Sequence, residues 1–368
     1  MMTDTATIPI AFSTTPSATA KAAAEREAIL ADPGFGKHFT DHMATISWTI
    51  GEGWHDARIV PYGPLHLDPA ASVLHYAQEI FEGLKVYRHA DGSIWAFRPE
   101  ANARRMQRSA ERLALPQLPE ALFVEAIKRL VEVDAAWVPS APETSLYLRP
   151  FMIASEAFLG VRAAQAVDFH VIASPAGAYF PGGVRPVSIW LSQDYTRAGR
   201  GGMGAAKTGG NYAASLLPQA EAYEQGCQQV VFLDAEERRY VEELGGMNVF
   251  FVYGDGRVVT PALSGTILEG ITRSSVIRLA EDRGHTVEER RVPIEEWRDG
   301  VASGAITEVF ACGTAAVITP IGVLKARDFT VGSLDAPAGA LTMSLREELT
   351  DIQYGRREDH HDWMRRLA

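Results

Sequence analysis

Apolar residues in the first half of the chain recur in short alternating or continuous runs, the pattern of β-strands. The predicted strands cover 43–50, 84–88, 94–97, 145–155 and 169–173. The turn Ala90-Asp91-Gly92 separates two of these runs and predicts a hairpin. Helices are expected from Pro99 to about Leu115, because proline suits a first helical turn, and over roughly 119–133. The first half is therefore a mixed domain whose strands are mostly joined by turns.

Two segments interrupt this pattern and divide the chain. Residues 1–33 are rich in Ala, Thr and Ser without a strand pattern, and predict a flexible arm or short helix, with ordered structure beginning near Phe35. Residues 175–186 are dense in Pro and Gly and are interpreted as the interdomain loop. An N-terminal domain over 34–174 and a C-terminal domain over 187–368 follow from this division.

The second half also alternates between strand and helix patterns. Strands are expected at 187–195, 229–233 and 248–253, with a strand pair around 308–320, and helices at 213–225 and 271–283. The end of the chain, His360-His361-Asp362, is interpreted as a solvated tail and not as a metal site, because no third ligand lies at a ligand spacing.

Composition narrows the class of protein. The chain has 368 residues, 46% of them hydrophobic and 22% charged, which is typical of a soluble globular protein of two domains. A net charge of −11 argues against nucleic acid or an anionic membrane as the main partner, because phosphate binding needs a basic surface. Two cysteines, Cys227 and Cys312, suit a reducing compartment, and neither a secretory signal nor a membrane-spanning run is present. We therefore expect a cytoplasmic protein.

The segment GRGGMGAAKTGGNYAA at 199–214 carries the strongest chemical signal. Six glycines surround Lys207, and Tyr212 follows five positions later. Glycine is used where backbone turns sharply or approaches a ligand, and a lysine in such a loop can act as a nucleophile for Schiff-base formation. The alternative without chemistry is an exposed lysine in a flexible glycine loop. A second functional hypothesis is a nucleotide-binding P-loop, but Ala206 stands where the second glycine of that motif belongs.

Four further segments could contribute to a binding site. Arg105 lies in the helix that begins at Pro99, where an inward arginine could clamp a phosphate. The predicted helix at Ile271 offers free N–H groups at its start, and the Gly313-Thr314 turn follows a strand. The tandem carboxylates Glu242 and Glu243 are of a kind that is usually exposed, although one of them could face inward.

Taken together, the motifs resemble those of the branched-chain amino acid aminotransferases, which are class IV, fold-type IV enzymes dependent on pyridoxal 5'-phosphate. The resemblance runs from about Gly34 to Arg327. In chain order it is carried by HYAQEIFEGLKVYR, FRPEANARRMQRSA, SLYLRPF, AAKTGGNYAASL, VEELGGMNVFF, LEGITR and ACGTAAVITP. It implies a two-domain α+β or α/β fold, with a smaller N-terminal α/β domain and a larger C-terminal domain that contains a barrel-like sheet.

The resemblance also implies a role for each matched residue. Lys207 matches the catalytic lysine that holds the coenzyme as a Schiff base, Tyr212 the tyrosine at its phenolic oxygen, and Glu243 the partner of its pyridine nitrogen. The implied phosphate cradle comprises Arg105, Gly270, Ile271, Thr272, Gly313 and Thr314. The implied substrate wall comprises Tyr76, Phe81, Tyr147, Arg149, Leu159, Val161, Thr314, Ala315 and Ala316, with Leu159 and Val161 reaching the neighbouring subunit's site in a homodimer.

The implied reaction moves an amino group from leucine, isoleucine or valine to 2-oxoglutarate. Arg149 is our choice for the side-chain carboxylate of glutamate. Ala316 and Thr319 stand where some members carry a Cys-x-x-Cys pair, so thiol regulation is not implied. In the family, a threonine often hydrogen-bonds the glutamate that faces the pyridine nitrogen, and glycines stand in its place here. A D-amino acid aminotransferase or an aminodeoxychorismate-lyase-like enzyme would share Lys207 and Glu243, but SLYLRPF and HYAQEIFEGLK follow the branched-chain pattern.

Overall fold

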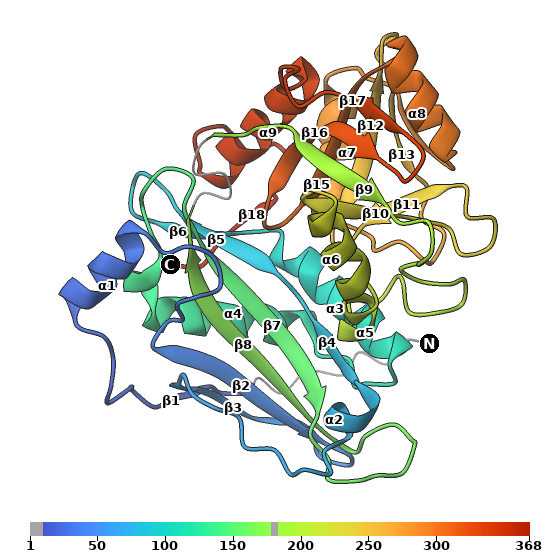
Figure 1. The fold of residues 1–368 in the computed structure, drawn as a ribbon. Helices are drawn as coiled ribbons and strands as arrows, with labels where there is room; N and C mark the ends of the chain where they lie inside the picture. Colours follow the sequence, from blue (N-terminus) through green and yellow to red (C-terminus); the bar gives the residue numbers. More distant parts are fainter. Residues whose placement is uncertain (1–9, 178–182) are drawn as a thin grey trace, which may run out of the picture. The chain divides into compact units, whose positions relative to one another are not determined.

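The computed structural model describes residues 10–177 and 183–368, which form two compact units (Figure 1). Unit 1 contains the described residues up to Gly177 together with Arg366–Ala368. Unit 2 contains the described residues from 183 to Arg365. Within the proposed interdomain loop at 175–186, positions 178–182 lie outside the described residues.

Unit 1 is built on a nine-stranded sheet in the order β1-β3-β2-β8-β7-β5-β6-β18, with β4 pairing with β7. Strands β2 to β8 pair antiparallel with their neighbours, and β1 is parallel to β3. The strands are β1 (Ser13–Thr14), β2 (His42–Thr49), β3 (Gly53–Pro61), β4 (Glu79–Phe81), β5 (Leu84–Arg88), β6 (Ile94–Phe97), β7 (Ser145–Ala154), β8 (Ala166–Ala176) and β18 (Met364–Arg366).

The helices of unit 1 cover this sheet and complete its core. They are α1 (Ala23–Ala31), α2 (Ser72–Tyr76), α3 (Pro99–Arg112), α4 (Glu120–Val133) and the short 3-10 helix η1 (Ala135–Trp137). Helix α4 packs across β2, β3 and β8 and against α3. Its apolar positions Phe123, Ile127 and Leu130 recur at helical spacing and are fully buried, so that burial of this stripe holds the helix on the sheet.

Unit 2 contains a second nine-stranded sheet, in the order β11-β10-β9-β16-β15-β12-β13-β14, with β17 pairing with β16. The sheet curls, because residues beside its two end strands are hydrogen-bonded: Val241 N donates to Val292 O at 2.8 Å, and Ile294 N donates to Arg239 O at 2.8 Å. The strands are β9 (Val187–Leu191), β10 (Gln229–Leu233), β11 (Val241–Leu244), β12 (Asn248–Tyr253), β13 (Val258–Pro261), β14 (Val287–Arg290), β15 (Ile306–Gly313), β16 (Val317–Lys325) and β17 (Thr330–Gly332). The expected barrel-like sheet is confirmed.

The helices of unit 2 pack on this sheet and alternate with its strands along the chain. They are α5 (Gly209–Ala213), α6 (Leu216–Glu224), α7 (Ile271–Asp282), α8 (Ile294–Ser303) and α9 (Ala340–Gln353). Helix α6 packs on β10, α8 on β15 and β17, and α7 and α9 on β15. Trp297 of α8 packs edge-on against Phe251 of β12 at a centroid distance of 5.1 Å, and this contact fixes α8 on the sheet.

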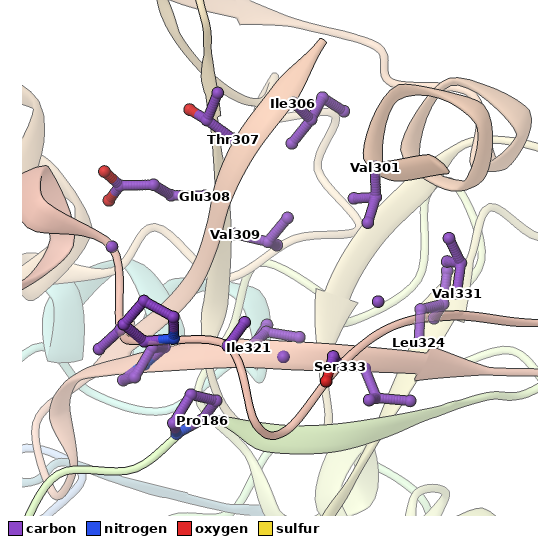
Figure 2. Close-up of a pocket in the computed structure, with 18 of the residues that line it drawn as sticks. Pro186, Val301, Ile306, Thr307, Glu308, Val309, Ile321, Leu324, Val331 and Ser333 are labelled. Atoms are coloured by element: carbon purple, nitrogen blue, oxygen red, sulfur yellow. The ribbon is translucent and has the colours of Figure 1, made fainter. Parts of the chain in front are cut away.

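Under the segment before α9 lies a mostly apolar cavity of about 130 Å³ (Figure 2). Val301, Ile306, Ile321 and Leu324 line it, and Glu308 extends to one side. The Glu308 carboxylate accepts hydrogen bonds at the start of α9, from Leu341 N, Thr342 N and the Thr342 hydroxyl. None of the candidate site residues lines this cavity.

Several sequence expectations are confirmed and others are wrong. The hairpin at 84–97 and helices α3 and α4 are present close to the expected bounds. Ordered structure begins before Phe35, because β1 pairs with β3 and Lys21 N donates to Asp41 Oδ1 at 2.9 Å, while α1 adds a helix. His360 and Asp362 are exposed, as expected of a solvated segment, but the residues after them are held on the sheet: Ile94 N donates to Ala368 O at 2.9 Å, and Leu367 is buried.

Candidate active site

In unit 1, a buried ion pair holds Arg105 on the inner face of α3. Its guanidinium donates from Nε to Glu82 Oε1 at 2.8 Å and from Nη2 to Glu82 Oε2 at 2.7 Å. Asn102, one turn earlier on α3, donates to Glu82 Oε2 at 2.8 Å. Arg104, Arg108 and Arg112 are exposed. Arg105 is therefore the arginine of this helix that points inward.

Sequence reasoning missed Glu82, although one signal was present. The residue is a charged side chain between Phe81 and Gly83, within the otherwise apolar end of EIFEGLK, and it is fully buried. A buried carboxylate needs a partner, and Arg105 is 23 positions away, beyond any local pattern. A bidentate arginine–carboxylate pair also fixes the plane of the guanidinium.

Beside this pair, Tyr147 and Arg149 occupy the same face of β7, since side chains alternate along a strand. Arg149 Nη2 donates to the Tyr147 hydroxyl at 3.1 Å, and its guanidinium lies 4.8 Å from the centre of the Phe81 ring. The buried Nε of Arg149 has no hydrogen-bond partner among the described residues. A β-carbon at Gly83 would lie 2.2 Å from the Tyr147 hydroxyl, so glycine is required there. Three predicted substrate residues thus lie together.

The other predicted substrate residues of unit 1 lie at the end of α2 (Tyr76) and on an exposed loop (Leu159 and Val161). Tyr76 donates its hydroxyl hydrogen to the backbone carbonyl of Leu159. Leu159 is 60% and Val161 87% exposed, high values for apolar side chains. Among the described residues, no hydrogen bond or ring contact joins them to Arg149 or Tyr147, so their place in a site stays a prediction.

In unit 2, the glycine-rich segment presents Lys207 just before helix α5. The Lys207 Nζ donates to the Tyr212 hydroxyl at 2.5 Å. Asn211 holds the loop from within, donating to the carbonyls of Met203 at 2.7 Å and Ala206 at 2.8 Å. The lysine is half-buried. The predicted pair of lysine and tyrosine is therefore formed.

The close approach of this loop explains one of its glycines. A β-carbon at Gly204 would lie 2.3 Å from the carbonyl oxygen of Thr266. No side chain fits there, because real β-carbons essentially never approach backbone so closely. Gly204 therefore allows the lysine loop to lie directly on the segment that leads to α7.

Both tandem carboxylates are buried on β11, contrary to what is usual for such pairs. Glu243 Oε1 accepts a hydrogen bond from Leu268 N at 2.8 Å and is paired with Arg197 Nη1 at 2.8 Å. Burial raises the pKa of Glu243 to about 7, against the lowering effect of Arg197. Burial also raises the pKa of Glu242. Sequence reasoning missed Arg197, for which no local pattern existed.

A turn between β11 and β12 brings the remaining segments of unit 2 together. A β-carbon at Gly246 would lie 3.7 Å from the Tyr212 ring, and one at Gly313 would lie 3.1 Å from Met247 Cγ. A β-carbon at Gly270 would lie 2.0 Å from Asn248 Oδ1. The predicted segments at Tyr212, Gly313 and Gly270 therefore converge on residues 246–248.

The predicted phosphate positions lie at the ends of two elements. Gly270 precedes α7, whose first residues are Ile271 and Thr272, and Thr314 follows β15. The N-terminus of a helix such as α7 carries the positive end of the helix dipole, which suits an anion. Ala315 adjoins Thr314, and Ala316 is buried and accepts a hydrogen bond from Arg346 Nη1 at 3.3 Å.

The donor set suits a phosphorylated pyridine carbonyl compound. A lysine amine can form an imine with its carbonyl, the Tyr212 hydroxyl can bond its phenolic oxygen, and a buried carboxylate can face its ring nitrogen. Both contacts of Glu243 reach Oε1, so that Oε2 is the oxygen suited to the ring nitrogen. The threonine that this chain lacks is not needed to hold the Glu243 carboxylate, because Leu268 N and Arg197 Nη1 already bond it.

Comparison with known proteins gives a consistent picture. Residues 79–323 match the family model "Amino-transferase class IV". The chain is 59% identical over 363 residues to a branched-chain-amino-acid aminotransferase of Mycolicibacterium smegmatis, covering 98% of this chain and 99% of the relative. It is 60% identical over 351 residues to the enzyme of the same name from Mycobacterium tuberculosis, covering 94% and 95%.

Solved structures agree. The branched-chain amino acid aminotransferase of Thermobaculum terrenum in its PLP-form superimposes with a TM-score of 0.71 and 26% identity, covering 88% of this chain and 98% of that chain. The branched-chain aminotransferase of Thermoproteus uzoniensis with norvaline gives a TM-score of 0.72 and 27% identity, covering 88% and 100%.

Proposed function

This chain belongs to the class IV aminotransferases, and from this premise we propose that it transfers the amino group of L-leucine, L-isoleucine or L-valine to 2-oxoglutarate. The observation that carries the proposal is the Lys207–Tyr212 pair in a chain with about 60% identity to branched-chain aminotransferases. The products are the branched 2-oxo acid and L-glutamate. Such identity over nearly the whole chain disfavours a D-amino acid aminotransferase, an aminodeoxychorismate-lyase-like enzyme and a P-loop protein.

The coenzyme is pyridoxal 5'-phosphate, which supplies when bound a carbonyl group that condenses with amines and a ring that withdraws electrons. We propose that Lys207 holds it covalently and that Tyr212 donates to its phenolic oxygen. Glu243 keeps a proton on its ring nitrogen. The phosphate lies in a cradle formed by Arg105, Gly270, Ile271, Thr272, Gly313 and Thr314.

The catalytic proton transfer falls to Lys207. With the coenzyme bound, the Lys207 amine would take the proton from the substrate Cα as a base and then give it up as an acid. The Tyr212 hydroxyl, 2.5 Å from Nζ, orients this amine. Proton transfer is fast because the amine is already within reach and needs no diffusion.

In the proposed site, the substrate is recognised by an apolar wall that contains one cation, Arg149. We propose that Tyr76, Phe81, Tyr147, Ala315 and Ala316 face the substrate, with Leu159 and Val161 reaching the site of a second subunit in a homodimer. The amides of Thr314 and Ala315 are assigned to the α-carboxylate. Arg149, flanked by the Phe81 and Tyr147 rings, is assigned to the side-chain carboxylate of glutamate and 2-oxoglutarate.

We further propose a cytoplasmic location. No helix among residues 10–177 and 183–368 is long and apolar enough to cross a membrane. Both cysteines are free and buried, and burial raises the pKa of Cys312 to about 12, so this thiol stays protonated and inert.

Borohydride reduction tests the proposal directly. Purified protein is expected to show a visible absorbance band that shifts when L-leucine is added. Reduction fixes the coenzyme irreversibly to its lysine, and mass spectrometry of a digest should place the adduct on the peptide that contains Lys207. Lys85, in the EIFEGLK segment, is the internal control. An adduct on Lys85, or none, would refute the assignment.

A further inference from the structure

A second cavity of unit 2, of about 300 Å³, lies over β11 and β13 and is lined by charged and polar side chains. Buried Glu242, Thr266 and Ile267 form its floor, and exposed Arg200 and Arg291 stand at its rim. None of the candidate active-site residues lines it. Its volume is at the lower end of the range for small-molecule sites, which suits a ligand of amino-acid size.

The floor of this cavity contains an unsatisfied carboxylate oxygen. Glu242 is 6% exposed, and its Oε1 accepts the hydroxyl hydrogen of Thr266. The Thr266 hydroxyl is in turn 2.6 Å from that of Ser264. Glu242 Oε2 is buried without a hydrogen-bond partner among the described residues. Leaving a carboxylate oxygen buried without a donor is costly, so the site favours a ligand that brings an N–H donor, best a cationic one.

The rim of the cavity carries positive charge, opposite to the charge of Glu242 on the floor. Arg200 makes no hydrogen bond or ion pair with any residue that the structure describes. Arg291 is already engaged, stacked 3.4 Å from the centre of the Tyr240 ring and paired with Glu237 at 2.8 Å. Asp234 is also committed, because it accepts backbone N–H groups of Glu237, Arg239 and Tyr240. Glu236, an exposed carboxylate, also lines the cavity. The Glu242 carboxylate on the floor, the Glu236 carboxylate and the Arg200 guanidinium at the rim therefore remain for a ligand.

We propose that this cavity binds a free α-amino acid, with the ammonium group at Glu242 Oε2 and the carboxylate at Arg200. Pro261, Ala262 and Ile267 provide the apolar wall against which its side chain packs. A simple anion would face the Glu242 carboxylate, and a simple cation would leave Arg200 unused. Only a molecule that carries both charges satisfies floor and rim together.

This site is distinct from the proposed active site and does not rest on the proposed reaction. It lies next to that site, however, through one shared residue. The Thr266 side chain bonds Glu242, while its carbonyl accepts from Arg197 Nη1 at 2.9 Å, and Arg197 pairs with Glu243. Glu242 and Glu243 leave β11 on opposite faces, so each serves its own ligand.

Calorimetric titration of the borohydride-reduced holoenzyme tests the proposal, because the fixed coenzyme no longer exchanges with amines. The probes are L-leucine, 3-methylbutylamine and 4-methylpentanoate, which carry both charges, only the positive charge and only the negative charge. L-Leucine is expected to bind saturably, and at least tenfold more tightly than either single-charge probe, because each charge-assisted hydrogen bond contributes about that factor. Equal binding of the amine or of the acid would overturn the proposal.

Variants locate the binding. Glu242→Gln and Arg200→Gln should each weaken L-leucine binding by about tenfold or more. Glu295→Gln and Arg239→Gln, which alter a surface pair outside the cavity, are the matched controls and should leave it unchanged. Arg200 is exposed, so its variant tests the site even if Glu242→Gln impairs folding. Absence of binding, or binding indifferent to both variants, would refute the site. Failure of the Lys207 adduct would instead refute the proposed function.

Discussion

At the scale of single residues, the role proposed for Arg149 requires one cation to serve two unlike substrates. Its guanidinium lies over the Phe81 ring and bonds the Tyr147 hydroxyl, so it borders an apolar wall and still has hydrogen-bond donors to offer. The carboxylate of a glutamate side chain can use those donors. A leucine side chain instead packs on the aromatic rings and leaves the arginine untouched.

Arg149→Leu should therefore affect the two half-reactions unequally. Loss of a charge-assisted, partly desolvated pair is expected to lower kcat/KM of the glutamate half-reaction by roughly 10²-fold. The leucine half-reaction should change much less. Single-turnover rates of each half-reaction, measured together with the melting temperature, check this. A parallel fall in both rates and in thermal stability would show that Arg149 only holds the strand.

Glu243 makes a prediction about pH, because burial raises its pKa to about 7 from an ordinary value of 4.5. A carboxyl group that ionises less readily in the folded than in the unfolded chain gives stability below pH 4.5, which is lost as pH rises towards 7. In the coenzyme-free protein, the parent should therefore lose stability relative to Glu243→Gln between about pH 5 and about pH 8, by on the order of a few kcal/mol.

Denaturant midpoints of the two proteins at a series of pH values provide the measurement. Glu237→Gln, which alters an exposed carboxylate, is the control and should keep a constant difference from the parent. A constant difference for Glu243→Gln as well would mean that Arg197 keeps this carboxylate ionised throughout, and the protonation argument would be wrong.

At the scale of elements, helix α9 depends on a side chain from a distant strand. No side chain of its own caps its N-terminus, and Glu308 of β15 accepts from Leu341 N at 3.1 Å and from Thr342 N at 2.8 Å. A β-carbon at Gly339 would lie 2.1 Å from Glu308 Cδ. The glycine therefore makes room for the carboxylate that caps the helix (Figure 2).

Gly339→Ala is accordingly expected to displace Glu308 and to destabilise the protein by about 1–2 kcal/mol, the usual cost of losing a helix cap. Glu308→Ala should cost a similar amount. The double variant should be no less stable than Glu308→Ala alone, because both changes remove the same interaction. Chemical denaturation of the three variants decides this, and fully additive losses would disprove the shared cause.

The elements also show what the sequence can predict. Helices α3 and α4 and the β5–β6 hairpin were predicted because their periodicity and turn residues are local. Strands β3 and β14 were missed because their polar residues hide the alternation. The helix expected at 213–225 is present as α6, which begins only at Leu216, and the separate short helix α5 before it was not expected. Helices α8 and α9 were not expected from their apolar pattern.

The residues of the candidate site also differ in whether local sequence predicts their contacts. Lys207 and Tyr212 lie five positions apart in a segment rich in glycine, and their contact follows from local sequence. Glu82 and Arg197 find their partners over 23 and 46 positions, so no local pattern predicts them. Burial of both Glu242 and Glu243 depends on segments that meet only in the folded sheet.

At the scale of the whole molecule, the exposed loop at 157–161 points to assembly. Ala157 bridges to Ala71, and Phe158 N donates to Ala70 O at 3.0 Å, so this loop and the α2 segment form one surface. Leu74, Leu159 and Val161 are each more than half exposed on it, at 59%, 60% and 87%. Exposed apolar side chains on neighbouring segments are typical of an interface, and this supports the proposed homodimer.

The double variant Leu159→Asp/Val161→Asp should therefore be monomeric and should lose most of its activity, because charges at the centre of an interface are strongly destabilising. Val133→Asp, at a position 40% exposed on α4, is the control and should leave both properties unchanged. Light scattering of the eluting protein together with its activity checks this. A wild-type monomer that stays fully active on dilution would contradict the shared site.

The pairing of Ile94 with residues 367 and 368 has a consequence for biosynthesis. The ribosome synthesises the chain from the N-terminus. Strand β6 therefore emerges some 270 residues before β18, its neighbour at the sheet edge. Throughout the synthesis of unit 2, this edge of the first sheet stays open. An open edge can pair with other strands, so the nascent protein exposes a site for wrong pairing until Met364–Arg366 have been synthesised.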